Sequence, residues 1–405
     1  MGRSLRIALL SYRSKPHSGG QGVYVRALSR ELRELGHRVE VVSGQPYPVL
    51  DDGVPLTELP SLDLYREPDP FRTPALREFR DWIDVAEYAA MCTAAFPEPL
   101  TFSLRAARWL RGSGFDIVHD NQSLGWGLLR TGLPTVATIH HPVAVDRDIE
   151  LAAAGFRRSL TLRRWYAFTG MQARVARRLP AITTVSASSQ RDIQRLMGVP
   201  TDRVEVIPVG IDPSDFSPPS GPRDVDHVVV TTSADVPLKG LVPLLEAIAK
   251  LRTEREVRLT VVGSAKAGGL AATAVERLSL ADAVTFTGPL PQADLVGLLQ
   301  RATAAVVPSL YEGFSLPAIE AMACATPLVT TDAGALPEVV GSHAAVQVPA
   351  GDVDRLAGAL ALVLDHRGLQ EQLGRAGRTR VLENFTWRST AVRTADWYEQ
   401  VLDAC

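Results

Sequence analysis

Two glutamates eight positions apart follow a short apolar run that ends at Pro308. Glu312 lies in a glycine-containing loop, and Glu320 lies about one turn into the helix that the next residues predict. Backbone N–H groups of Phe314, Ser315 and Leu316 would lie at the N-terminus of that helix, where a phosphate binds well. A carboxylate such as that of Glu320 accepts two hydrogen bonds from a cis-diol such as ribose. The alternative is that both glutamates only favour the helix N-terminus.

Lys239 lies between another predicted strand and the helix that follows it, before Gly240. A lysine there can reach a bound diphosphate. At ~4 Å and an effective dielectric constant of about 20, one such charge pair is worth about 4 kcal/mol. The alternative is a solvated lysine at a helix start, where it opposes the helix dipole.

A third segment, residues 17–24, carries glycines ahead of a predicted helix and suits phosphate in the same way. It does not match the dinucleotide fingerprint, because counting from Gly20 puts Val25 where the third glycine belongs. The second strand also ends in Val-Val-Ser, without the acidic residue that holds a ribose hydroxyl. A tight turn without a ligand is the competing interpretation.

Short β-branched runs alternate with helical stretches along the chain, which predicts α/β layering around parallel sheets. The predicted strands of the first half are 6–10, 37–43, 117–120, 135–139, 181–186 and 204–208, with a helix over 22–35. Those of the second half are 228–232, 258–263, 284–287, 304–308, 327–331 and 345–348. Residues 211–226, rich in Pro, Ser and Asp, are expected to be a hinge linker. The final segment, from 387 to 402, predicts a helix with Val392, Trp397 and Val401 on its apolar side.

Size and composition fit a two-domain globular enzyme. The chain has 405 residues, 46% of them hydrophobic, and a net charge of −2, which gives no general attraction for nucleic acid. Its three cysteines have no metal-ligand spacing, as expected of a protein in a reducing compartment. No apolar run approaches the ~20 residues of a membrane span, and the N-terminal apolar stretch reads as a first strand. The expected location is the cytoplasm, with a peripheral position at the inner membrane face as the alternative.

The double-glutamate segment and the following Thr331-Asp-Ala-Gly-Ala-Leu-Pro-Glu338 together resemble the retaining glycosyltransferase family 4, also called glycosyl transferases group 1. The resemblance is strongest over residues 228–384. It extends to the rest of the chain through the glycine loop, Thr138-Ile-His140, Val185-Ser-Ala187 and Ile207-Pro-Val-Gly-Ile-Asp212. It implies the GT-B fold, with two Rossmann-like doubly wound parallel-sheet domains that face a cleft. The expected division is an acceptor-binding domain over 1–212, a nucleotide-sugar domain over 213–386, and a C-terminal helix over 387–405 that returns to the first domain.

The resemblance also implies roles for single residues. His140 would contact the transferred sugar, although His141 beside it leaves that assignment open by one position. Lys239 would neutralise the diphosphate, and Glu312 would hold sugar hydroxyls. These are the three expected catalytic residues. The expected donor-binding residues are Gly19, Gly20, Gly263, Leu290, Phe314, Ser315, Leu316 and Glu320, of which Glu320 would bind ribose and Gly263 and Leu290 would line the base pocket.

One position departs from the family pattern. The family usually has an arginine five residues before the lysine, and Ala234 stands there, followed by Asp235. The expected reaction is transfer of a hexose from a UDP- or GDP-type sugar with retention of configuration, without a metal or other cofactor. Two alternatives remain open: another GT-B activity, such as a sugar-nucleotide epimerase or hydrolase, and a degenerate protein that binds the nucleotide sugar without transferring it.

Three Asp-x-Asp triplets, at 146–148, 224–226 and 352–354, invite comparison with divalent-metal sites. None stands in a glycine turn with further oxygen ligands, and Asp352 reads as a helix cap, so no metal site is expected.

The acceptor is expected to be a small molecule or a lipid. Residues 157–179 hold seven arginines among aromatic and aliphatic side chains. They predict either peripheral contact with an anionic membrane or a surface helix with an apolar core-facing side. Residues 54–104 are the least typical part of the chain and are where acceptor identity is expected to be determined.

Overall fold

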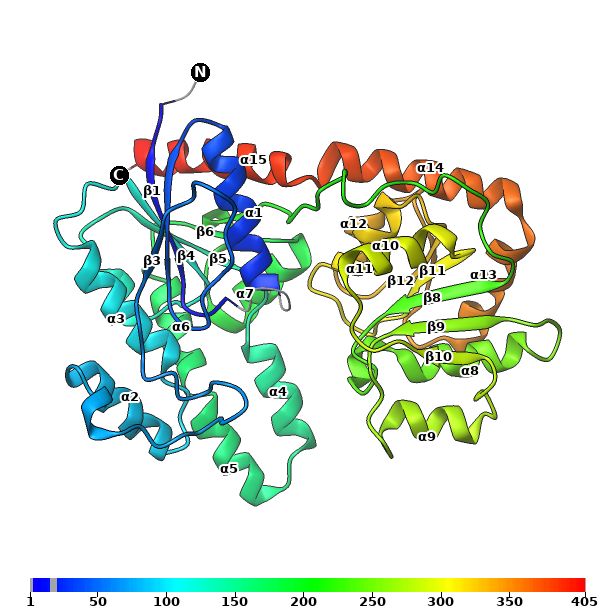
Figure 1. Cartoon of the computed structure of the whole chain (residues 1–405), viewed down its shortest axis with the longest axis horizontal. Coiled ribbons are helices and arrows are strands. Elements are labelled where there is room, and N and C mark those ends of the chain that lie inside the picture. Colours follow the sequence, from blue (N-terminus) through cyan, green and yellow to red (C-terminus); the bar gives the residue numbers. More distant parts are fainter. Residues whose placement is uncertain (1–2, 15–19, 405) are drawn as a thin grey trace. The chain divides into compact units, whose positions relative to one another are not determined.

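The computed structural model describes residues 3–14 and 20–404, and the chain forms two compact units (Figure 1). Unit 1 comprises Met1–Val209 with Thr390–Cys405, and unit 2 comprises Gly210–Ser389. Each unit is a parallel sheet with helices packed on it. The C-terminal helix, drawn in red, therefore begins in unit 2 and continues as part of unit 1.

Unit 1 is built on a seven-stranded sheet in the order β3-β2-β1-β4-β5-β6-β7, and every neighbouring pair is parallel. The central strands are almost wholly buried, so none of them alternates between apolar and polar residues: β1 (RIALLS) is mostly apolar, whereas β4 (IVHDN) and β5 (TVATI) also bury polar side chains. The strands are β1 (Arg6–Ser11), β2 (Arg38–Ser43), β3 (Leu56–Glu58), β4 (Ile117–Asn121), β5 (Thr135–Ile139), β6 (Ile182–Thr184) and β7 (Val204–Val206).

Helices cover the sheet of unit 1, and their ends follow local sequence signals. Helix α7 begins after Ser186, whose hydroxyl accepts from the Ser189 N–H, and ends at Gly198 in the left-handed conformation. The helices are α1 (Gly20–Glu34), α2 (Trp82–Cys92), α3 (Glu98–Leu110), α4 (Ala144–Ala153), α5 (Phe156–Trp165), α6 (Phe168–Ala176), α7 (Ala187–Met197) and α15 (Trp387–Asp403), with short 3-10 turns η1 (Leu76–Glu78), η2 (Trp126–Arg130) and η3 (Thr201–Arg203).

Unit 2 also consists of a parallel sheet with helices packed on it, and its six strands lie in the order β10-β9-β8-β11-β12-β13. Its strands are β8 (His227–Thr231), β9 (Arg258–Val262), β10 (Val284–Phe286), β11 (Ala304–Val307), β12 (Leu328–Thr331) and β13 (Val346–Val348). Its helices are η4 (Pro237–Lys239), α8 (Leu241–Leu251), α9 (Leu270–Arg277), α10 (Gln292–Arg301), α11 (Leu316–Ala323), α12 (Leu336–Val340), α13 (Val353–Asp365) and α14 (Arg367–Asn384).

The predicted strands are all present, with ends that differ by one or two residues. Strand β3 was not predicted, because it has only three residues, on the sheet edge, within the atypical segment. The prediction for Val392 is wrong. Its side chain is 39% exposed, and the buried side of α15 instead includes Ala391, Trp397 and Tyr398.

The segment expected to be a hinge linker is bonded to unit 2. Ile211 forms an isolated parallel bridge with Thr386, and Phe216 is buried. The guanidinium of Arg223 donates to five backbone carbonyls of residues 299, 300, 302, 324 and 325. These contacts hold both ends of the segment against the body of unit 2.

The arginine-rich segment 157–179 forms two helices rather than one, because α5 ends before Tyr166 and α6 starts at Phe168. Helix α6 buries an apolar face that includes Met171 and Val175, as the core-packing interpretation requires. Helix α5 has no buried residue, and its four arginines are exposed together with Phe156. Nowhere in residues 3–14 and 20–404 is a helix both long and apolar enough to cross a bilayer.

Candidate active site

The two charged residues expected to act on the donor are in contact within unit 2. The Lys239 ammonium donates to Oε1 of Glu312 at 2.8 Å, and the Ser309 hydroxyl donates to the same oxygen at 2.8 Å. The Glu312 side chain is 9% exposed and that of Lys239 is 36% exposed. In the residues that the structure describes, Oε2 of Glu312 has no partner. It is therefore available to a ligand hydroxyl.

Two glycines allow these loops to approach each other. Gly240, with φ +68°, lies against the first residue after β11, and a Cβ there would be 1.9 Å from the Pro308 carbonyl oxygen. Gly334, with φ +58°, lies against the loop after β11, and a Cβ there would be 2.2 Å from the Glu312 carbonyl oxygen. Only glycine tolerates both the positive φ and the close backbone contact. The loops after β8, β11 and β12 thus meet around Glu312.

Glu320 lies on α11, half-buried, and its carboxylate has no hydrogen-bond or ionic partner among the described residues. Burial alone raises its pKa to about 7. Such a group costs free energy when ionised and unpaired, which is typical of a residue whose partner is a ligand.

The backbone ahead of α11 has the form expected for an anion site. Ser315 has φ +99°, unusual for a non-glycine residue, and its hydroxyl accepts from the Ala318 N–H at 3.4 Å. The Phe314 side chain packs edge-on against Phe385 at 5.8 Å and so contributes only its backbone to a ligand. No described residue accepts a hydrogen bond from the N–H groups of Phe314, Ser315 or Leu316. These three groups are free at the positive end of α11.

The two positions expected to line the base pocket lie on adjacent loops, after β9 and β10. Gly263 packs against the residue that follows β8, where a Cβ would be 2.1 Å from the Thr232 carbonyl oxygen. The Gly288 N–H donates to the Gly263 carbonyl at 3.2 Å, and half-buried Leu290 follows two positions later. The hydroxyl of Thr232 is buried without a partner in the described structure, a feature that sequence reasoning did not identify.

Ala234 and Asp235, the departure from the family pattern, have structural roles. Ala234 is 4% exposed and belongs to the hydrophobic core of unit 2. The Asp235 carboxylate accepts from the N–H groups of Lys266 and Ala271 at 2.7 and 3.2 Å. Hydrogen bonding to Lys266 lowers the pKa of Asp235. Its charge is thus satisfied by the 266–271 loop.

His140 lies at the carboxyl end of β5 in unit 1. Its Nε2 is 2.8 Å from Oδ1 of Asn121, and its backbone N–H donates to Oε1 of Gln122 at 2.8 Å. Tyr24 meets the imidazole edge-on at 4.8 Å. Burial, with a smaller effect of His141, lowers the pKa of His140 to about 4. The ring is therefore neutral at neutral pH and donates through Nε2 to the Asn121 amide oxygen.

The adjacent His141 differs from His140. Its Nε2 is 2.8 Å from a carboxylate oxygen of Asp146, and its side chain is 39% exposed. Gln122 donates from Nε2 to the His141 carbonyl at 2.8 Å. Asn121 is the last residue of buried β4 and Gln122 follows it, and the polar end of that strand is the signal that could have identified them.

A series of buried, hydrogen-bonded polar side chains packs next to the end of β5. The Tyr398 hydroxyl of α15 contacts Nδ1 of His119, and His119 Nε2 is 2.6 Å from the Thr138 hydroxyl. Thr138 in turn lies 3.1 Å from the hydroxyl of Tyr24. Burial lowers the pKa of His119 to about 3, so this ring is also neutral. The C-terminal helix is thereby connected to the strand end that carries His140.

The glycine loop is described only in part. Gly19 lies outside the described residues, and Gly20 is the first residue of α1. The neighbouring Gln21 carbonyl accepts from the Asn121 amide at 3.5 Å. The start of α1 and His140 therefore share Asn121 as a neighbour.

In each of the three Asp-x-Asp triplets, an aspartate carboxylate contacts another group of the protein. Asp352 caps α13 by accepting from the Arg355 N–H at 3.0 Å, as predicted. Asp146 pairs with His141, and Asp224 lies 3.0 Å from Nδ1 of His227. Within the described ranges, no group of three or more His, Cys, Asp or Glu residues is arranged to hold a metal ion.

Comparison with known proteins assigns the chain to a family. Residues 18–215 match the family described as Glycosyltransferase Family 4, and residues 214–380 match Glycosyl transferases group 1. The MMP alpha-(1→4)-mannosyltransferase of Mycolicibacterium hassiacum is 51% identical over 98% of both chains. The glycogen synthase of Mycobacterium tuberculosis is 28% identical over 97% of this chain and 94% of its own.

Solved structures agree on the fold. The sucrose-phosphate synthase of Thermosynechococcus elongatus superposes with a TM-score of 0.72 at 23% identity, covering 100% of both chains. HepE from Anabaena, solved in complex with UDP and glucose, gives 0.68 at 16% identity over 98% of this chain and 99% of its own. The chain is therefore a glycosyltransferase of the GT-B fold and belongs to glycosyltransferase family 4.

Proposed function

We propose that this enzyme transfers mannose from a nucleotide diphosphate mannose to the 4-hydroxyl of a sugar acceptor, with retention of the α configuration and without a metal ion. The observation that carries the proposal is 51% identity, over 98% of both chains, to an enzyme named MMP alpha-(1→4)-mannosyltransferase. An identity of this size over nearly the full length of both chains makes that relative's sugar and linkage the natural first assignment.

The contacts in unit 2 support a nucleotide-sugar donor. Lys239 and the free N–H groups at the start of α11 supply positive potential for a diphosphate. The unpaired Glu320 carboxylate suits a ribose diol. Glu312 Oε1 holds the Lys239 ammonium while Oε2 remains for a sugar hydroxyl, so one carboxylate positions both the cation and the moving sugar.

The state of His140 supports a front-face substitution. A neutral imidazole whose pKa is about 4 is a weak base at neutral pH and does not take the acceptor proton efficiently. In the proposed reaction the anomeric C–O bond to phosphate breaks as the acceptor oxygen attacks from the same face. The acceptor proton passes to the departing phosphate oxygen. Lys239 and the α11 N-terminus stabilise the charge that develops on that leaving group.

A donor screen followed by product analysis tests the proposal. Thermal shift with UDP, GDP and ADP sugars identifies the donor, because a ligand that binds only the folded state raises Tm. Turnover of the mannose donor with methyl α-mannoside should then give an α-(1→4) product by NMR, unchanged by EDTA. A β-linked product, or loss of activity with EDTA that manganese restores, would overturn the mechanism.

The same measurements separate the two alternatives. Donor consumption without an acceptor would indicate a hydrolase or an epimerase. Donor binding without any turnover would indicate a degenerate binding protein. The missing arginine at Ala234 is the reason to keep the degenerate protein as an alternative, whereas the charge of the neighbouring Asp235 is satisfied by the 266–271 loop.

A further inference from the structure

His140 is held by hydrogen bonds at three of its four polar atoms. Its N–H donates to Oε1 of Gln122 at 2.8 Å, its carbonyl accepts from the Ser189 hydroxyl at 3.3 Å, and its Nε2 lies 2.8 Å from Oδ1 of Asn121. The ring of Tyr24 meets the imidazole edge-on and restrains it further. No described residue forms a hydrogen bond with the fourth atom, Nδ1. The half-buried side chain therefore has one polar atom left for a ligand.

The Asn121 amide satisfies its two neighbours in only one orientation. The Gln21 carbonyl, at the start of α1, can only accept a hydrogen bond, so the amide nitrogen of Asn121 faces it at 3.5 Å. The amide oxygen of Asn121 then faces Nε2 of His140. The reverse orientation would place the amide oxygen of Asn121 against the Gln21 carbonyl oxygen, with no hydrogen between them. Asn121 therefore presents a hydrogen-bond acceptor to the imidazole.

This orientation decides which ring nitrogen of His140 carries the proton. The ring is neutral at neutral pH, because burial lowers its pKa to about 4, so one nitrogen is protonated and the other is not. An amide oxygen accepts only from an N–H group, which places the proton on Nε2 and a lone pair on Nδ1. The open atom of His140 is thus an acceptor. It can bind a hydroxyl group, but it can bind neither a phosphate oxygen nor an ether oxygen.

The sheet of unit 1 fixes the position of Asn121. Asn121 is the last residue of β4, and in the sheet register it is paired with Ser11 of β1 on one side and with Thr138 of β5 on the other. Helix α1 follows β1 along the chain, and His140 is the residue after β5. Asn121 therefore lies at the strand end that separates the start of α1 from His140.

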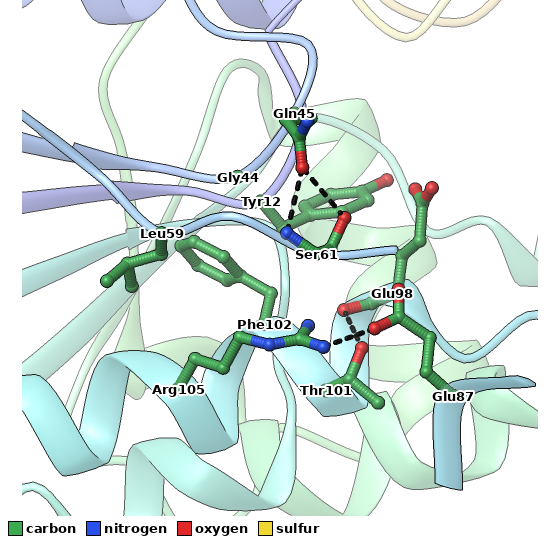
Figure 2. A pocket seen from close by; sticks show the side chains of 10 residues that line it. All are labelled: Tyr12, Gly44, Gln45, Leu59, Ser61, Glu87, Glu98, Thr101, Phe102 and Arg105. Atoms are coloured by element: carbon green, nitrogen blue, oxygen red, sulfur yellow. Dashed lines mark hydrogen bonds and ion pairs between the residues drawn. The ribbon is translucent and has the colours of Figure 1, made fainter. Parts of the chain in front are cut away.

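The end of β1 is also held in place (Figure 2). Tyr12, the residue after β1, packs against Gly44, where a Cβ would lie 2.5 Å from the Tyr12 carbonyl oxygen. Glu87 and Arg105 line the same small space as Tyr12 and pair with each other. A side-chain hydrogen bond joins Tyr12 to Gln21. Gln21, whose carbonyl orients the Asn121 amide, is therefore attached to the end of β1.

We propose that Asn121 is a positioning residue that sets the tautomer of His140, so that Nδ1 accepts a hydrogen bond from one hydroxyl of the transferred sugar. The inference rests on the proposed function, because it takes the moving group to be a sugar that contacts His140. It gives the enzyme a specificity. A donor sugar in which that hydroxyl is removed or methylated leaves Nδ1 without a partner and should react more slowly. The competing explanation is that Asn121 only connects α1 to β4.

The tautomer can be measured in the whole protein without a substrate. In protein with ¹⁵N-labelled histidine, long-range proton–nitrogen NMR correlations show which ring nitrogen is protonated, and His140→Gln assigns the signals. At pH 7 the wild type should carry the proton on Nε2. Asn121→Leu should lose this preference, whereas Asn121→Asp, which still offers an oxygen, should keep it. A proton on Nδ1 in the wild type, or an unchanged tautomer in Asn121→Leu, would overturn the inference.

Transfer kinetics with modified donors test the sugar contact. Nucleotide mannose analogues that each lack one hydroxyl are compared with the complete donor in wild type and in Asn121→Leu. For one analogue the wild type should lose at least tenfold in kcat/KM, and this loss should shrink to less than threefold in Asn121→Leu. The Kd of the free nucleoside diphosphate, which has no sugar, should stay within twofold of wild type. If every analogue loses the same factor in both proteins, Nδ1 does not hold a sugar hydroxyl.

Thr183→Val is the matched control. It removes a buried hydrogen bond with Thr138 on the neighbouring strand, 2.7 Å long, without touching the His140 side chain. The control should keep the wild-type tautomer and the wild-type losses with every analogue. If Asn121→Leu does not fold, the wild-type tautomer and the activity of Asn121→Asp decide, and a loss of the Nε2 proton in Asn121→Asp contradicts the inference.

Failure of the proposed function gives a different result. The enzyme would then transfer no mannose, while the wild-type tautomer could still be read from the NMR spectrum. In that case the nucleotide sugar with the largest thermal shift replaces the mannose donor. Its binding should move the Nδ1 resonance of His140, whereas the matching nucleoside diphosphate should not. Equal movements with both ligands, or none with either, contradict the sugar contact.

Discussion

Glu320 gives a pH-dependent prediction for nucleotide binding. Its carboxylate has no protein partner, and burial raises its pKa from 4.5 to about 7. At about 1.4 kcal/mol for each tenfold change in equilibrium constant, ionising this group in the free enzyme costs about 3 kcal/mol more than in water. A ribose diol that donates to both oxygens requires the ionised form, so nucleotide binding should release a proton below pH 7.

The expected magnitude follows from that pKa. At pH 5.5 only about 3% of the free enzyme carries an ionised Glu320, whereas at pH 8 most of it does. The affinity for the nucleoside diphosphate should therefore rise about 30-fold between these pH values through Glu320. In Glu320→Gln this contribution should disappear, and the affinity at pH 8 should fall about 10- to 100-fold.

Titration calorimetry at the two pH values measures this effect. The terminal phosphate of the nucleotide also ionises in this range, but it does so equally for both proteins, so the ratio of wild type to Glu320→Gln isolates the carboxylate. Glu312→Gln serves as a second comparison and should keep the wild-type pH dependence, because its partners are Lys239 and Ser309. If the ratio of the wild-type affinity to the Glu320→Gln affinity is the same at both pH values, the ribose assignment is refuted.

Stability without a ligand provides an independent readout. The folded-state pKa of Glu320 is higher than the unfolded value, so the folded protein binds more protons between about pH 4.5 and 7. Its contribution to the free energy of unfolding is present at low pH and is lost as the pH rises through 7. Glu320→Gln should therefore be more stable than wild type at pH 8, by up to about 3 kcal/mol. A variant that is less stable at pH 8 would show that the carboxylate has a structural partner.

Three further predictions concern other parts of the molecule. Lys239→Met should lower kcat/KM by about three orders of magnitude, since one charge pair near a diphosphate is worth about 4 kcal/mol; steady-state turnover within tenfold of wild type would exclude that role. Glu98, with a pKa raised to about 8, should make the free energy of unfolding fall as the pH rises from 5 to 8, and urea unfolding of Glu98→Gln should show a shallower fall. The exposed arginines of α5 predict binding to anionic liposomes that fades with salt, at about 1 kcal/mol for each basic residue; no sedimentation at low salt would favour a soluble acceptor.

The strands were predictable because their sequence signals are local, and local signals also marked the candidate site residues. A buried parallel strand is mostly apolar, and ligands of such sheets bind near the strand ends, so Glu312, Glu320 and Lys239 were predicted as candidate site residues from their positions after such strands. Helix caps were predictable for the same reason, as Asp352 illustrates. Each of these features depends on residues within about ten positions of one another.

The tertiary structure decided which groups meet across long stretches of chain. Lys239 and Glu312 are 73 positions apart, and no local pattern says that they share a hydrogen bond. Likewise, the support of His140 by Asn121 and Gln122 depends on the pairing of β4 with β5. The unpaired Oε1 of Glu87 exists only because α2 and α3 pack against the ends of three strands. The sequence therefore determined the helices and strands and the types of side chain at their ends. The burial of each ionisable group and its hydrogen-bonding partners, which together set its pKa, depend on packing between segments that are distant in the sequence.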